Sequence, residues 1–157
     1  MRANKVLMIR PVSFGFNHET AASNTFQIET VVDQEAIQKE FDDSVAELRK
    51  FGIHVDVIED TKSPIKPDSI FPNNWIQMRS DGALVVFPML TENRRVERRL
   101  DILDFLIANY RVKQVVDMSG EELKGRILEG TGSVVFDHYL NKSLKPPATF
   151  FLSLFPY

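Results

Sequence analysis

Short apolar segments alternate along the chain with two longer segments of helical periodicity. Residues 6–9 form a continuous apolar run, which is typical of a buried strand. Asp33 is a good N-cap, and apolar residues recur every three or four positions after it, so a helix is predicted to Phe51, with Gly52 as its stop. An alternating strand is predicted over residues 53–58. This order of elements favours an α/β fold.

The second half of the chain repeats this order with one more strand. Strands are predicted over 75–78 and 83–87, joined by a turn at 80–82. A second helix is predicted over 91–110. Its expected core stripe is Val96, Leu100, Leu103, Ile107 and Tyr110.

The segments after this helix continue the pattern and then stop. A strand is predicted over 112–116 and a short helical turn over 119–124. Two more strands, 127–129 and 133–137, are predicted around the glycines of 130–132. A strand–strand–helix–strand unit thus recurs, and its third copy has no helix. Such a unit does not bury its apolar face alone and needs neighbours.

The last stretch differs from everything before it. Residues 141–157 read NKSLKPPATFFLSLFPY, with a Pro-Pro break before an aromatic segment. This stretch is expected to pack on the core, to pack on another copy, or to be disordered. The predicted organisation is therefore a partial α/β domain over 1–138 and an unrelated tail over 139–157.

Composition narrows the classes of partner and cofactor. The 157 residues suit one domain, and a net charge of −3 gives no electrostatic case for nucleic acid or an anionic membrane. No apolar run approaches the roughly 18 residues of a spanning helix, so a cytoplasmic protein is expected. The chain has no cysteine, which excludes thiolate metal sites and disulfides. The three histidines have no ligand spacing, so neither a metal nor another cofactor is expected.

A cluster of arginines falls inside the predicted second helix. Arg94, Arg95, Arg98 and Arg99 are interleaved with Glu92, Glu97 and Asp101. The interpretation preferred here is a solvated helix face. The alternative is an anion site.

Two polar segments could bind a ligand. Asn73 and Asn74 supply amide donors and acceptors without charge, and Glu129 stands between an apolar run and two glycines. Those glycines allow a close approach of the backbone. A part-buried carboxylate at this place would bind a cation, and a guanidinium fits by bidentate hydrogen bonding. The other interpretation is that Glu129 caps a turn, and the residues alone leave both open.

Other candidate groups give weaker signals. The glycines of 130–132 precede neither a Gly-Lys-Ser/Thr motif nor a helix, so they do not form a phosphate loop. Ser133 has no indicated base. His18 stands beside Glu19, but adjacent side chains usually point apart. His54 is predicted at the surface, and His138 follows the last strand.

Three segments together resemble a known family. RPVSFGFNHETAASNTFQ, PDSIFPNNWIQMRSDGALVVFPMLTENRRVER and LEGTGSVVFD are similar to arginine-deiminase-related, amidinotransferase-like proteins of the guanidine-modifying superfamily. The resemblance covers about residues 5–138. It implies a five-bladed, pentein-like α/β propeller, of which this chain holds roughly two and a half units. It also implies a guanidine or ureido substrate such as arginine or citrulline, a cysteine nucleophile and a histidine base.

The resemblance assigns site residues one by one. Glu129 matches the guanidinium-binding glutamate, and Asn74, next to Asn73, matches a loop position where deiminases carry an aspartate. Asn17 lies in a first-unit loop expected to face the same site. No catalytic residue is assigned, because the nucleophile is absent.

These assignments predict an N-terminal fragment of a hydrolase that is inactive by itself. A frame change or premature stop after Asp137 is the expected origin. The alternative is a binding or self-assembly module, in which a second copy or a partner chain covers the open propeller edge.

Overall fold

The structure is a computed structural model that describes residues 4–21, 27–130, 135–137 and 142–144. The chain divides into two compact units, Met1–Pro72 and Asn73–Tyr157. Each unit is described by itself.

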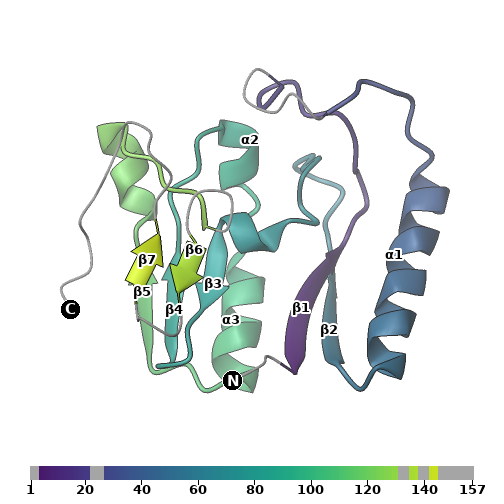
Figure 1. Cartoon of the computed structure of the whole chain (residues 1–157). Coiled ribbons are helices and arrows are strands. Elements are labelled where there is room, and N and C mark those ends of the chain that lie inside the picture. Colours follow the sequence, from purple (N-terminus) through teal and green to yellow (C-terminus); the bar gives the residue numbers. More distant parts are fainter. Residues whose placement is uncertain (1–3, 22–26, 131–134, 138–141, 145–157) are drawn as a thin grey trace. The chain divides into compact units, whose positions relative to one another are not determined.

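The first unit is a strand–helix–strand arrangement. Strands β1 (Lys5–Arg10) and β2 (His54–Glu59) pair in parallel, and α1 (Gln34–Lys50) runs beside them (Figure 1). The Asp33 side chain caps α1, since it accepts hydrogen bonds from the backbone N–H groups of Glu35 and Ala36 at 3.0 and 3.2 Å. The predicted strands and helix of this half are confirmed.

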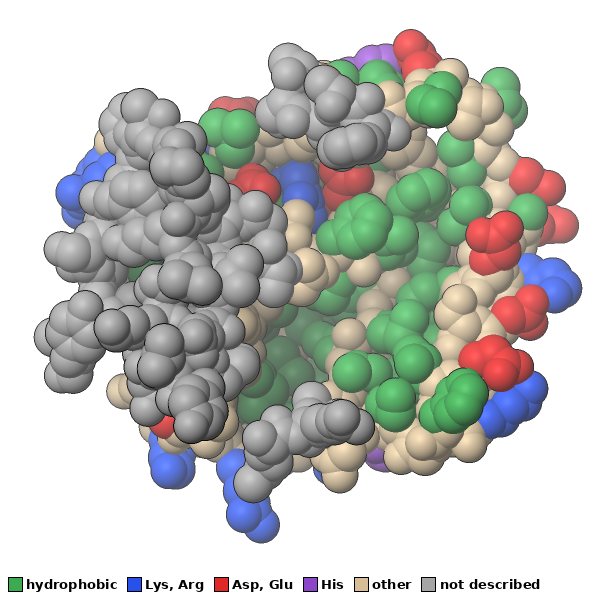
Figure 2. Space-filling view, viewed as in Figure 1, with side chains coloured by type: hydrophobic (Ala, Val, Ile, Leu, Met, Phe, Trp, Pro, Cys, Tyr) green, Lys and Arg blue, Asp and Glu red, His purple; other side chains and the backbone are tan. Residues whose placement is uncertain are grey.

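An ion pair ties β1 to α1. The Arg10 guanidinium donates to both carboxylate oxygens of Asp42, at 2.8 and 2.9 Å, and to Glu59 at 3.1 Å. The hydrogen bond from Arg10 holds the pKa of the Asp42 carboxyl below its ordinary value. Figure 2 shows further charged side chains along the edge of this unit where α1 lies.

The second unit is built on a three-stranded sheet. The 3₁₀ turn η1 (Pro72–Asn74) leads into β3 (Ile76–Met78), which pairs antiparallel with β4 (Ala83–Val86). Strand β5 (Gln114–Asp117) pairs in parallel with β4. All four residues of β4 are buried, because this strand is central. These three strands were predicted and are confirmed.

The predicted second helix is broken in two. The structure has α2 (Glu92–Arg95) and α3 (Leu100–Asn109) instead of one helix over 91–110. The break falls where Arg94 binds Glu97 and where Arg98 donates to Glu122, 24 residues further along the chain. The Arg94–Glu97 pair is local, whereas the Arg98–Glu122 pair is a tertiary contact that holds the chain between the two helices.

The predicted core stripe of that helix is wrong for the same reason. Val96, Leu100 and Ile107 are 42%, 76% and 47% exposed, while Ile102 and Leu106 are buried. A helix that begins afresh at Leu100 turns a different face inward than one continued from Thr91.

The chain after β5 forms a 3₁₀ turn and then an extended segment. The turn η2 (Ser119–Lys124) confirms the predicted helical turn. The predicted strand over 127–129 is wrong: its described backbone contact is one hydrogen bond, from the Leu128 N–H to the Pro88 carbonyl at 3.3 Å. Strand β6 (Val135–Asp137) pairs antiparallel with β7 (Lys142–Leu144). The other tail residues lie outside the described ones.

The core of the second unit reaches the segment that carries Glu129. Val85, Phe87 and Met118 are buried together, and Val116 and Leu128 pack against them.

Both units combine strands with helices, so the predicted mixed α/β class is confirmed. In the described part of the chain, no helix has the length and apolar character needed to cross a membrane.

Candidate functional site

Glu129 lies against the loop between β4 and α2. Its Oε1 accepts the Leu90 backbone N–H at 3.1 Å, and its Oε2 lies 4.0 Å from Arg94 Nη1. The side chain is 22% exposed. Glu129 is thus a part-buried carboxylate beside a guanidinium of the protein itself, and its binding of a substrate stays a prediction.

Arg94 is itself held by a buried ion pair. Its Nε and Nη2 donate to the two carboxylate oxygens of Glu97 at 3.0 and 3.1 Å, and the two side chains are 5% and 1% exposed. The interpretation of this cluster as a solvated helix face is therefore wrong for Arg94 and Glu97. The bidentate geometry offsets the cost of removing both charges from water.

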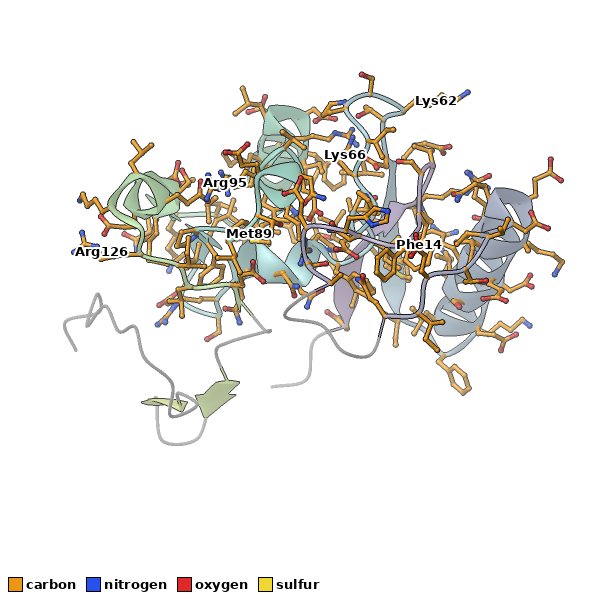
Figure 3. All side chains as sticks on the ribbon, turned by 90° about the horizontal axis from the view of Figure 1, so that it is seen from above. Phe14, Lys62, Lys66, Met89, Arg95 and Arg126 are labelled. Atoms are coloured by element: carbon orange, nitrogen blue, oxygen red, sulfur yellow. The ribbon has the colours of Figure 1, made fainter. Side chains whose placement is uncertain are left out.

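A second carboxylate, Glu122 on η2, holds the same loop. It accepts the Met89 backbone N–H at 2.6 Å, two hydrogen bonds from Arg98 at 2.5 and 3.0 Å, and lies 3.3 Å from Arg95 Nε. Figure 3 shows Arg95 close to Met89, with Arg126 further out. This role could not be predicted from the sequence, because Glu122 is one of two successive glutamates. Its neighbour Glu121 has its pKa lowered by the hydrogen bond from Lys124.

Asn73 and Gly130 meet in this unit. A side chain at Gly130 would collide with the Asn73 carbonyl oxygen and lie 3.1 Å from the Phe87 ring. The Asn73 side chain donates to Asn74 Oδ1 at 3.0 Å. The close approach expected from this glycine is thus made to the protein's own backbone, and it brings the Asn73 carbonyl against Gly130, the residue after Glu129.

Asn17 belongs to the first unit. It is fully buried, and its Nδ2 donates to Asp68 Oδ2 at 2.6 Å, while Gln27 donates to Asp68 Oδ1 at 3.4 Å. Asp68 is a buried carboxylate that the sequence reasoning did not single out, although it opens the Asp68–Trp75 segment. That Asn17 and Glu129 face one site stays a prediction.

The two described histidines are exposed, and each lies near a carboxylate. His18 is exposed and lies 3.8 Å from Glu29, and exposed His54 lies 3.0 Å from Asp56. Ser133 and His138 lie outside the described residues. Among residues that are described, no group of three or more His, Asp or Glu side chains gathers as a metal site.

Solved structures are similar to this chain in fold. The N-terminal domain of ArgZ bound to product, an arginine dihydrolase from the ornithine-ammonia cycle in Cyanobacteria, is 18% identical with a TM-score of 0.60. The match covers 85% of this chain and 44% of that one. AgrE in its ternary complex with ornithine and NAD+ is 20% identical with a TM-score of 0.58, over 85% of this chain and 18% of that one. The chain thus spans less than half the length of these structures.

Sequence comparison gives the family. No curated protein sequence matches the chain. The family profile described as N,N dimethylarginine dimethylhydrolase, eukaryotic, matches residues 10–144, which is most of the chain. The resemblance to guanidine-modifying proteins is therefore confirmed, and the chain belongs to the N,N dimethylarginine dimethylhydrolase family in its eukaryotic form.

Proposed function

We propose that this chain binds the guanidine or ureido group of a small molecule such as arginine or citrulline through Glu129. One observation supports this proposal most directly. The Glu129 carboxylate accepts the Leu90 N–H at 3.1 Å, and its side chain is still 22% exposed. A fixed, accessible carboxylate binds a planar cationic donor with little loss of side-chain entropy. Membership of a dimethylarginine dimethylhydrolase family supports a guanidino compound as the ligand.

The amides of Asn73 and Asn74 complete the proposed site. The Asn73 backbone carbonyl lies against Gly130, the residue after Glu129, and the side-chain amides of Asn73 and Asn74 are hydrogen-bonded to each other and carry no charge. Asn17 is proposed to contribute from the first unit. In this proposal the two units are successive parts of a propeller in a cytoplasmic protein, and the resemblance to the superfamily is the support for it.

Binding is proposed to occur without turnover. The chain has no cysteine to attack the guanidine carbon. Enzymes typically lower barriers by about 8–23 kcal/mol, and losing the nucleophile removes a large part of that. We propose that the chain is the substrate-holding part of a hydrolase of this family.

A self-assembly role has one supporting observation. Strand β5 is the outer strand of a parallel pair, yet its Val115 is 45% exposed. Parallel strands are usually covered on both faces. Sedimentation that shows only monomers at high concentration would count against this second role.

The binding proposal is tested by calorimetric titration of the whole chain with L-arginine and with L-citrulline. Glu129→Gln should weaken binding at least tenfold, since it removes the charge. The control Glu92→Gln makes the same chemical change at an exposed residue of the same unit and should leave binding unchanged. Absence of binding to either ligand refutes the proposal, and sustained ammonia release refutes the claim that there is no turnover.

A further inference from the structure

We propose that Arg95 and Glu122 are positioning residues for Glu129, acting through the backbone of Met89 and Leu90. The effect on ligand binding rests on the function proposed above. The geometric part stands on contacts within the second unit alone.

The backbone of this loop is bound on both sides. The successive N–H groups of Met89 and Leu90 donate to two different carboxylates, Glu122 at 2.6 Å and Glu129 at 3.1 Å. The carbonyls of the same two residues accept from Arg95, Met89 from Nε and Leu90 from Nη2, each at 3.0 Å. The direction of the Leu90 N–H, and with it the position of Glu129 Oε1, therefore depends on Arg95 and Glu122.

Burial of the side chain holds Met89 in place but not Leu90. Met89 is fully buried, whereas Leu90 is 53% exposed. Apolar packing therefore does little to orient the Leu90 peptide, and hydrogen bonds must do so. Arg95 is suited to this because its rigid guanidinium reaches two carbonyls at once, which the single ammonium of a lysine does not reproduce.

Glu122 is itself held in place. Its side chain is 7% exposed, and Arg98 donates to both of its oxygens. Charge-assisted hydrogen bonds of this kind are stronger than neutral ones. Glu122 thus acts as a fixed acceptor for Met89, one residue before the peptide that holds Glu129.

The test is NMR spectroscopy of the whole chain at one pH. Glu129→Gln should move the amide proton resonance of Leu90 upfield, because a neutral acceptor binds this N–H less strongly than a carboxylate does. In Arg95→Lys and in Glu122→Gln, the Leu90 resonance should move the same way by at least half as much, although Glu129 is intact. Affinity for L-arginine should fall about tenfold. The control Glu121→Gln, at the neighbouring residue, should change neither quantity.

A purely structural role would lower the melting temperature and leave the Leu90 amide resonance as it was. An unchanged Leu90 resonance in both folded variants therefore overturns the proposal. If the variants do not fold, hydrogen exchange of the unaltered chain decides: the Leu90 amide should be protected as strongly as the Met89 amide, and exchange at the rate of an unprotected amide overturns the proposal. If the chain binds no L-arginine, the proposed function fails, and these amide measurements still decide the positioning role.

Discussion

Replacing Glu97 by glutamine leaves the Arg94 guanidinium buried without its partner charge. Both side chains are almost fully buried and are joined by two hydrogen bonds. Breaking a buried pair by removing one partner costs about 3–5 kcal/mol. Glutamine still accepts one hydrogen bond, and Glu129 remains 4.0 Å from Arg94. The expected cost of Glu97→Gln therefore lies just below that range, at about 2–3 kcal/mol.

Urea unfolding followed by tryptophan fluorescence measures this cost. Trp75 is the one tryptophan of the chain and lies buried in the same unit as the pair. With an m-value of about 2 kcal/mol per molar, the midpoint should fall by about 1–1.5 M. Lys124→Gln is the control, because this lysine is 60% exposed and its pair with Glu121 should contribute less than about 1 kcal/mol.

A double variant separates the charge from the packing. Arg94→Met with Glu97→Leu removes both charges and should be clearly more stable than the sum of the single changes implies, since no unpaired ion remains. A cost for Glu97→Gln no larger than that of the control would refute the argument. So would single costs that simply add in the double variant.

Three further predictions concern the close approach at Gly130, a buried lysine and an acid-sensitive ion pair. Gly130→Ala should cost about 1–3 kcal/mol in the same fluorescence assay, whereas Gly120→Ala, with nothing within 4 Å, should cost less than about 1 kcal/mol. Lys66→Met should destabilise the first unit by about 3–5 kcal/mol in circular dichroism melts, because it strips a fully buried ammonium from its carboxylate partner on the same loop. Lys62→Met, at an exposed side chain that extends away from the ribbon in Figure 3, should change little. The lowered pKa of Asp42 means that its ion pair stabilises the fold above its ordinary pKa and is lost as the pH falls through the folded value. Asp42→Asn should therefore flatten the loss of melting temperature on acidification, and an unchanged acid slope would contradict this.

The first unit was predictable because its signals are local. The cap at Asp33 and the periodicity behind it are both properties of a short stretch of sequence. The turn at Gly82, in the second unit, is also specified by a short stretch of sequence, and Gly82 has a φ of 94°. Elements of this kind need no knowledge of distant partners.

The broken second helix was not predictable in this way. Val96 and Leu100 fit a continuous helical stripe, and nothing nearby interrupts it. The deciding contacts are the burial of Arg94 and the reach of Arg98 to Glu122 on η2. An ion pair between residues far apart in sequence, such as Arg98 and Glu122, overrides the helical periodicity of a local stretch.

The residues of the candidate site also divide into those with a local sequence signal and those without one. Glu129 was identifiable because a carboxylate after an apolar run and before glycines is unusual in a short stretch. Glu122 and Asp68 were not, since each gains its role from partners that are far away in sequence: Met89 and Arg98 for the first, Asn17 for the second. The guanidinium at Glu129 was expected to come from a substrate, and no local pattern assigned it to Arg94.

The charge balance around Glu129 narrows what the site can bind. Glu97 compensates Arg94 through two short hydrogen bonds, whereas Glu129 lies 4.0 Å from the same guanidinium. These three groups together carry one net negative charge, and the amides of Asn73 and Asn74 add none. One external cation would therefore be matched, and a neutral ureido group would leave that charge to Arg94 and to the Leu90 N–H. L-arginine should therefore bind more tightly than L-citrulline, and Glu97→Gln should reverse or remove that preference, because the Arg94 charge then compensates Glu129. Equal affinities in the unaltered chain would show that Glu129 is already neutralised from within, and that the ligand is recognised by shape and amide hydrogen bonds.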